Sequence, residues 1–283
     1  MFDRRTKNVE IFKDTEFLYK TNEELKVAIT SSLERQYLIA ANEALEPAAG
    51  NKRCGKVVVS GKKTIEASEQ YAKQGKKVCV LNFASATNPG GGVTHGSSAQ
   101  EEAICRCTTL YPCLDTDNMW KSFYLPHRRA DDPLYNDDCI FTPAVKVFKS
   151  DSDYPELLAQ SEWWDVDVIT CAAPNLRYVP SNRMNPHSGR NRADISDKAL
   201  KQLLTKRIEK IFHLAIHENA EALILGAFGC GAFWNPSQLV ASVFAEFTEK
   251  YRDYFDVIEY AVYHREHEKT NYEAFMGAMK RFF

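Results

Sequence analysis

The sequence lacks the segments that mark membrane proteins and nucleic-acid-binding proteins. No run approaches the ~20 consecutive apolar residues that span a bilayer, and the N-terminus, MFDRRTKNVE, carries charge but no apolar signal core. Lysine and arginine number 36 against 38 aspartates and glutamates, so the net charge of −2 provides no broad basic field. We expect a monomeric cytoplasmic protein that binds neither membranes nor DNA directly; delivery into a host cell as an effector is compatible with the same features.

The sequence also has no C-x-x-C pair, although it contains eight cysteines. Several of these cysteines lie in apolar, strand-like runs, such as KKVCVLNFA and VDVITCAAP. Buried, reduced thiols are typical of such positions in an intracellular protein. His213 and His217 are four residues apart, but the run HLAIH lacks the glutamate of a zinc protease motif. We therefore expect no bound metal and no other cofactor.

Two common nucleotide-binding motifs are absent as well. No G-x-x-x-x-G-K-[ST] loop occurs, and no G-x-G-x-x-G is followed by a ribose-binding acid at the usual distance. These absences exclude a P-loop kinase and a Rossmann oxidoreductase.

Strand-like and helix-like segments alternate along most of the chain, with no repeat and no linker between them. The apolar runs predict strands at 56–60, 77–84, 139–147, 166–171, 222–226 and 257–263. The segments with helical periodicity are 22–47, 63–74, 194–219, 237–250 and 272–281, with a further helix from about Ala99. This order predicts an α/β fold, with residues 1–50 as a helical extension and residues 51–283 as one domain around a largely parallel sheet.

Two of the predicted strands end in glycine-dense loops that lead into helices. The first loop is Asn88-Pro89-Gly90-Gly91-Gly92, and the second runs through Gly226-Ala227-Phe228-Gly229-Cys230-Gly231-Ala232-Phe233-Trp234. Glycine lets backbone N–H groups come close to a ligand, and such groups at a helix N-terminus bind phosphate. Tight turns without a ligand are the alternative. Two loops of this kind favour a phosphate-bearing ligand at the carboxyl edge of the sheet.

An acidic pair, Glu101-Glu102, follows Gln100 eight residues after the triple glycine ends. Ser98 and Glu101 have the spacing of a capping box, which would give Glu101 a purely structural role. Glu102 lies outside that motif. A carboxylate beside a phosphate has a raised pKa, so it can serve as a protonated general acid, for example toward a glycosidic oxygen.

The triple glycine followed by Gln100-Glu101-Glu102 resembles the GGG-x(6–8)-QEE signature of the poly(ADP-ribose) glycohydrolases, most closely the compact microbial type. Other segments agree, namely VLNFASA at 80–86, TTLYP at 108–112, AAPN at 172–175 and GAFGCG at 226–231. The similarity runs from about Asn22 to the C-terminus. The resemblance implies a macrodomain-like, three-layer α/β/α fold with a mixed, largely parallel sheet and an N-terminal helical extension.

The resemblance also implies roles for individual residues. Glu102 matches the catalytic glutamate, which protonates the departing ribose 2′-oxygen and then activates water, and Glu101 matches the neighbour that orients the distal ribose. The residues implied in substrate binding are Asn88, Gly90, Gly91, Gly92, Gln100, Gly229, Cys230, Gly231, Ala232 and Phe233. The implied partners are ADP-ribose, ADP-ribosylated proteins and poly(ADP-ribose), and no metal is required.

Two other functions remain open from the sequence. A mono-ADP-ribosyl-protein hydrolase, acting on an arginine or glutamate linkage, would use the same pocket. A macrodomain that binds ADP-ribose without catalysis would share the glycine loops, although it gains little from two carboxylates beside a diphosphate. The length of the substrate, exo or endo action and the physiological target cannot be read from these residues.

Overall fold

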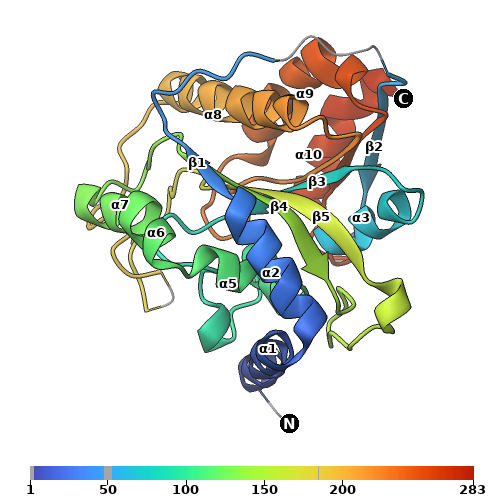
Figure 1. Cartoon of the computed structure of the whole chain (residues 1–283). Coiled ribbons are helices and arrows are strands. Elements are labelled where there is room, and N and C mark those ends of the chain that lie inside the picture. Colours follow the sequence, from blue (N-terminus) through green and yellow to red (C-terminus); the bar gives the residue numbers. More distant parts are fainter. Residues whose placement is uncertain (1–2, 48–52, 184) are drawn as a thin grey trace.

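A computed structural model describes residues 3–47, 53–183 and 185–283, and these form a three-layer α/β/α arrangement around one sheet (Figure 1). The strands are β1 (Tyr37–Ile39), β2 (Lys56–Ser60), β3 (Val78–Phe83), β4 (Cys139–Val147), β5 (Trp164–Cys171), β6 (Ala222–Leu225) and β7 (Val257–Ala261). The main helices are α1 (Arg4–Thr21), α2 (Glu23–Arg35), α3 (Thr64–Ala72), α4 (Gln100–Cys107), α8 (Asp197–His217), α9 (Ser237–Tyr251) and α10 (Thr270–Met279). Shorter helices are α5 (Leu110–Leu114), α6 (Asp117–Met119) and α7 (Leu125–Ala130), with single turns η1 (Val93–His95), η2 (Trp120–Tyr124), η3 (Gln160–Glu162), η4 (Arg252–Tyr254) and η5 (Lys280–Phe282).

The sheet is mixed, with a parallel centre and an antiparallel edge. Its strand order is β1-β4-β5-β3-β6-β7-β2. Strands β5, β3, β6, β7 and β2 pair in parallel, whereas β4 pairs antiparallel with both β5 and β1. The carboxyl ends of β3, β5, β6 and β7 therefore meet at one edge, which is where ligands bind in open α/β sheets. The predicted three-layer fold with a largely parallel sheet is confirmed.

Both faces of the sheet are buried, which explains why the central strands are apolar throughout. In β3, Val78 and Val80 point into a core formed with α1, α3, α4 and α5. Cys79 and Leu81 alternate with them and point into a second core, formed with α8, α9 and α10. Successive strand residues face opposite sides, so each layer of helices has its own core.

The N-terminal segment is less uniformly helical than its periodicity predicts. Helix α2 ends at Arg35, and residues 37–39 form β1, which pairs with Phe141–Cys139 of β4. The prediction of a helix or a helical pair over 22–47 is wrong beyond Arg35, because an edge position beside β4 was available to the apolar run Tyr37-Leu38-Ile39. The proposed domain boundary at residue 50 lies outside the described residues.

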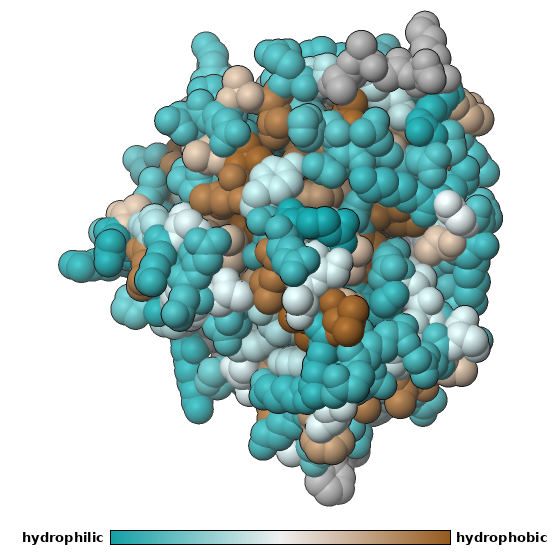
Figure 2. Space-filling model, in the orientation of Figure 1, coloured by the Kyte–Doolittle hydropathy of each residue, from teal (hydrophilic) through white to brown (hydrophobic). Residues whose placement is uncertain are grey.

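Figure 2 shows one face of the molecule as mainly hydrophilic, with apolar side chains in small separate patches. Among the described residues, no helix is long and apolar enough to cross a membrane. Six of the eight cysteines are buried, and all eight are free thiols. The expectation of mostly buried, reduced thiols is confirmed.

Candidate functional site

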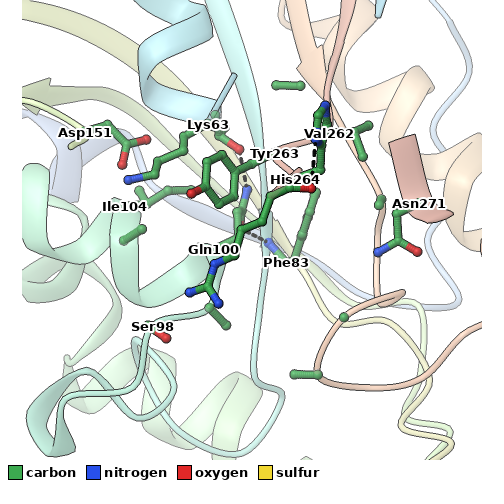
Figure 3. A pocket seen from close by; sticks show the side chains of 18 of the residues that line it. Lys63, Phe83, Ser98, Gln100, Ile104, Asp151, Val262, Tyr263, His264 and Asn271 are labelled. Carbon is green, nitrogen blue, oxygen red and sulfur yellow. Dashed lines mark hydrogen bonds between the residues drawn. The ribbon is translucent and has the colours of Figure 1, made fainter. Parts of the chain in front are cut away.

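A cavity of about 740 Å³ opens at the carboxyl edge of the sheet. Its wall includes the first turn of α4 and the second glycine loop, with Gln100 and Phe233. Residues that follow β7 also line the cavity, and Figure 3 shows Tyr263 and His264 near Gln100, with Asn271 farther away. This volume is within the range of small-molecule sites, so an elongated ligand can extend from α4 to the end of β7.

Gln100 fixes the first turn of α4 to the central strand. Strand β6 pairs with β3 only as far as Val80, which leaves the next backbone groups of β3 without a strand partner on that side. The Gln100 amide fills this gap: its Nε2 donates to the Leu81 carbonyl at 2.7 Å, and its Oε1 accepts from the Phe83 N–H at 2.8 Å (Figure 3). Gln100 thus positions the two glutamates that follow it. Direct contact of Gln100 with substrate stays a prediction.

The first glycine loop packs against the two carboxylates. Gly91 has φ +58°, and a Cβ at this position would lie 2.6 Å from Glu102 Oε1 and 3.0 Å from Glu101 Oε2. Only glycine allows both this backbone conformation and this approach. The N–H of Gly91 donates to the Asn88 carbonyl, and the N–H of Gly92 donates to Glu102. These two amides therefore hold the loop and the carboxylate, so substrate contact by Gly90, Gly91 and Gly92 stays a prediction.

Glu102 is held by one oxygen and leaves the other unbound. Its Oε1 accepts a hydrogen bond from the Gly92 N–H at 2.9 Å. Its Oε2 is buried and has no hydrogen-bond partner among the described residues. The side chain is only 7% exposed and lies behind Gly91 rather than on the cavity wall. A buried polar atom without a partner is costly, and in a functional site it marks the place where a proton or a ligand belongs.

Glu101 has both carboxylate oxygens engaged. Oε2 accepts from the Ser85 N–H at 2.7 Å, and Oε1 accepts from the Asn82 amide at 3.3 Å. The N-cap of α4 is Ala99, without a side-chain hydrogen bond. The capping-box interpretation of Ser98 and Glu101 is therefore wrong, because the carboxylate binds the Asn82 amide in β3 and the Ser85 N–H on the following loop instead.

Burial governs the ionisation of this pair. Loss of hydration raises the pKa of Glu102 above its ordinary value. Burial also raises the pKa of Glu101, and the neighbouring Glu102 charge raises it further. A raised pKa keeps a glutamate protonated closer to neutral pH, which suits a general acid.

The raised pKa of Glu102 predicts a pH-dependent cost in stability. The unfolded chain ionises this group at a lower pH than the folded chain, so wild-type stability falls as the pH rises through the interval between the two pKa values. In Glu102→Gln, the amide oxygen still accepts from Gly92. We expect the unfolding free energy of Glu102→Gln, relative to wild type, to increase between pH 4 and pH 7 by about 1.4 kcal/mol per unit of pKa shift. Urea unfolding of both proteins at both pH values measures this difference in unfolding free energy. A difference that stays constant or decreases from pH 4 to pH 7 contradicts the raised pKa.

The second glycine loop presents unused N–H groups. Gly229 has φ +73°, and a Cβ there would lie 2.4 Å from the Ala173 Cβ, so the loop passes directly over the segment after β5. No hydrogen bond from the N–H groups of Gly231, Ala232 or Phe233 occurs within the described parts of the chain. Gly231 and Ala232 are exposed, and all three residues line the cavity. Consecutive free amides of this kind can bind an anion.

Sequence reasoning missed three residues that organise the first loop. Arg128 donates from Nε to the Thr87 carbonyl at 2.7 Å and from Nη2 to Asn88 Oδ1. Arg128 thus fixes the Asn88 side chain through its oxygen, and contact of Asn88 with substrate stays a prediction. Asn82 was detectable as the one amide in the apolar strand run VCVLNF. Asn185 had no such signal in the sequence. Its Oδ1 accepts from Ser85 Oγ at 2.6 Å, a contact that depends on how two distant loops fold together.

Helix α1 packs against the segment from Gly96 to Arg106, which carries the two glutamates. Gly96 has φ +76°, and a Cβ there would lie 2.2 Å from the Arg5 carbonyl oxygen. The buried Asn8 amide donates to the Gly96 carbonyl at 3.0 Å, and Thr15 Oγ1 donates to the Arg106 carbonyl at 2.7 Å. The N-terminal extension therefore forms part of the site's framework.

Two further groups were examined for metal or nucleophilic chemistry, the histidine pair of the run HLAIH and the Cys230 thiol. His213 bonds the Leu45 carbonyl and the Tyr251 hydroxyl, and the described residues include no group of three or more potential metal ligands. Burial raises the pKa of Cys230 to about 12, so it is a neutral thiol rather than a nucleophile.

Comparisons with known proteins agree with this site. Residues 6–150 match the family described as microbial-type PARG, catalytic domain. The chain is similar to a solved poly(ADP-ribose) glycohydrolase (PARG) from Thermomonospora curvata, at 26% identity, with 97% of this chain and 100% of that chain covered and a TM-score of 0.79. A PARG from Deinococcus radiodurans, solved in complex with ADP-ribose, is 25% identical over 89% of this chain and 97% of that chain, with a TM-score of 0.74. No curated protein matches. The family match covers more than half of the chain, and it follows that the chain belongs to the microbial-type poly(ADP-ribose) glycohydrolases and is a glycosidase.

Proposed function

We propose that this enzyme hydrolyses the O-glycosidic ribose–ribose bond of poly(ADP-ribose) and releases ADP-ribose, with Glu102 as the general acid and base. The observation that carries the proposal is the buried Glu102 carboxyl, fixed through Oε1 by the Gly92 N–H, with no partner for Oε2 in the described parts of the chain. A group held by one oxygen can deliver a proton from the other in a defined direction.

The reaction that fits this geometry proceeds in two proton transfers. Glu102 in its protonated form gives its proton to the departing 2′-oxygen of the adjoining ribose as the bond to the anomeric carbon breaks. Positive charge develops on the terminal ribose, as in other glycosidases, and the Glu102 carboxylate stabilises it. The same carboxylate then takes a proton from the attacking water, and the product leaves with a hydroxyl at the anomeric carbon.

Glu101 serves a separate role in this proposal. Its carboxylate, held by Ser85 and Asn82, is fixed next to Glu102 and is placed to accept hydrogen bonds from the hydroxyls of the terminal ribose. Adjacent residues on a helix diverge by about 100°. Their side chains converge here only because the first glycine loop passes so close to α4.

The pyrophosphate is assigned to the second glycine loop. The unused N–H groups of Gly231, Ala232 and Phe233 supply donors for its oxygens, and Cys230 and Gly229 shape the turn. The adenosine then extends toward Tyr263, His264 and Asn271, along the remaining length of the cavity. Binding of an ADP-ribose ligand is supported by two similar proteins, the Deinococcus enzyme solved with ADP-ribose and the Thermomonospora enzyme solved with the inhibitor ADP-HPD.

Release of ADP-ribose from purified, labelled polymer tests this function. We expect chromatography to show ADP-ribose as the product, with no turnover of single ADP-ribose units on arginine, glutamate or serine side chains. Turnover confined to one of the single-unit linkages would favour a mono-ADP-ribosyl hydrolase. Tight ADP-ribose binding in a calorimeter, with no product from any substrate, would favour a reader domain and contradict the proposal.

We further propose that the enzyme works as a monomer in the cytoplasm and does not bind DNA. The cavity is bounded by elements of one chain, and the net charge is −2. Sedimentation of the purified enzyme at micromolar concentration measures the oligomeric state, and a dimer would contradict this part of the proposal.

A further inference from the structure

The loop that follows β5 carries an unusual concentration of positive charge for this chain. Residues 172–193 contain four arginines and no acidic residue, although acidic residues outnumber basic ones in the chain as a whole. Arg190 pairs with Asp131 at 2.8 Å. Over the described residues, no carboxylate lies within ion-pair distance of Arg177, Arg183 or Arg192. This loop therefore presents uncompensated positive charge to solvent.

Two of these arginines stack with exposed aromatic rings. The guanidinium of Arg192 lies 4.3 Å from the centre of the Tyr178 ring, and that of Arg177 lies 5.7 Å from the centre of the Trp234 ring. The two rings meet edge to face at 5.8 Å. Tyr178 is 66% exposed and Trp234 is 52% exposed. We call these four side chains the arginine–aromatic patch.

The stacking leaves the guanidinium edges free. The described residues contain no hydrogen-bond acceptor for the side chains of Arg177 or Arg192. A guanidinium that lies flat on a ring keeps its N–H donors pointing outward, where they can bind phosphate oxygens. Exposed aromatic rings beside such donors are typical of surfaces that bind a strand of nucleotides by stacking and charge.

The patch is continuous with the catalytic end of the cavity. Trp234 follows Phe233, whose carbonyl accepts from the N–H of Leu176. Farther along the same loop, Asn185 accepts from Ser85 Oγ at 2.6 Å, and the Ser85 N–H binds Glu101. This loop therefore borders the two glutamates, where the proposed function places the terminal ribose.

Resting on the proposed function, we propose that the arginine–aromatic patch binds the poly(ADP-ribose) chain beyond its terminal unit. The arginines bind the pyrophosphate, and Tyr178 and Trp234 stack with the adenine. Each unit of the polymer carries two negative charges and one base, which matches this mixture of groups. The patch lies outside the cavity for the terminal ADP-ribose, so it affects polymer binding without affecting the binding of ADP-ribose itself.

The test compares the variant Arg177→Gln/Tyr178→Ser/Arg192→Gln with wild type. We expect the KM for long polymer to rise by about tenfold or more and kcat to change by less than about twofold. The Kd for free ADP-ribose stays unchanged, and the salt dependence of polymer binding becomes shallower. The matched control Lys56→Gln/Lys206→Gln removes the same charge from unpaired exposed lysines on β2 and α8 and leaves the KM unchanged. Thermal unfolding establishes that each variant folds.

The same substitutions in a Glu102→Gln background separate this proposal from the proposed function, because polymer affinity can be measured there without turnover. Unchanged polymer affinity would overturn the patch proposal, even if wild type cleaves the polymer. Weakened polymer affinity would support it, even if wild type releases no ADP-ribose. An equal loss of affinity for free ADP-ribose would assign the patch to the terminal unit. Competition by oligo(dA) as strong as that by polymer of equal charge would identify a general nucleic-acid surface. Either an equal loss of ADP-ribose affinity or such competition by oligo(dA) would overturn the proposal.

Discussion

Glu102→Gln is expected to reduce turnover of poly(ADP-ribose) by about 10⁴-fold while ADP-ribose still binds. The amide keeps the size of the carboxyl and its hydrogen bond from the Gly92 N–H, since the bonded atom Oε1 becomes the amide oxygen. The Oε2 position has no partner among the described residues, so an NH₂ group there displaces no donor. What the variant loses is the proton that the departing oxygen needs and the base that activates water.

Kinetics on polymer measures the loss of turnover, and calorimetry with ADP-ribose measures whether binding is retained. Glu101→Gln provides an informative comparison, because both of its oxygens accept hydrogen bonds, from Ser85 and Asn82. An amide at position 101 places an NH₂ group against one of these donors. We therefore expect Glu101→Gln to disturb the position of the loop and to weaken ADP-ribose binding, unlike Glu102→Gln. Full activity of Glu102→Gln would remove Glu102 from the mechanism.

Gly91→Ala is expected to lower turnover by about 10²-fold, which is the effect of a misplacement of about 1 Å in a catalytic group. The new methyl would lie 2.6 Å from Glu102 Oε1, so either the loop or the carboxylate must move. The φ of +58° adds a backbone cost of about 1–2 kcal/mol for a residue with a Cβ.

Steady-state kinetics and urea unfolding of Gly91→Ala measure both consequences. The matched control is Gly277→Ala in α10, where an added Cβ meets no atom within 4 Å and φ is not positive. We expect the control to keep wild-type kinetics and to be about 0.5–1 kcal/mol more stable, because alanine is favoured over glycine within a helix. Wild-type turnover in Gly91→Ala would show that the loop does not fix the carboxylate.

The pattern of strands and helices was predictable because both faces of the sheet are buried. A strand such as VCVLNF is apolar at every position only when helices cover both of its faces. Strand β1 was not predicted because it is only three residues long and its residues share the periodicity of the preceding helix. Its assignment depends on pairing with β4, a contact between residues about a hundred positions apart.

The residues of the site were predictable, but the different roles of its two glycine loops were not. Both loops are rich in glycine and follow a strand, and both were interpreted as backbone cradles for phosphate. In the structure the amides of Gly91 and Gly92 are engaged within the loop and with Glu102, whereas Gly231 and Ala232 leave theirs unused. A high glycine content indicates that the backbone of a loop can approach another group closely. Whether that group is a side chain of the protein or a ligand depends on tertiary packing, which the sequence pattern does not show.

The arginine–aromatic patch illustrates the same limit. The Arg/Asn-rich loop at 174–192 was visible as a polar segment, but its contact with the second glycine loop was not. The contact of Arg177 with Trp234 joins residues far apart in the chain, next to the backbone hydrogen bond between Leu176 and Phe233.

The most direct test of the account is a crystal structure of Glu102→Gln with ADP-ribose bound. We expect pyrophosphate oxygens within about 3 Å of the N–H groups of Gly231, Ala232 or Phe233. We also expect the end of residue 102 that does not bind Gly92 to lie within hydrogen-bond distance of the hydroxyl on the anomeric carbon of the terminal ribose. A nucleotide seated in the reverse direction, with its adenine beside residue 102 and no ribose within reach of it, would contradict the central claim.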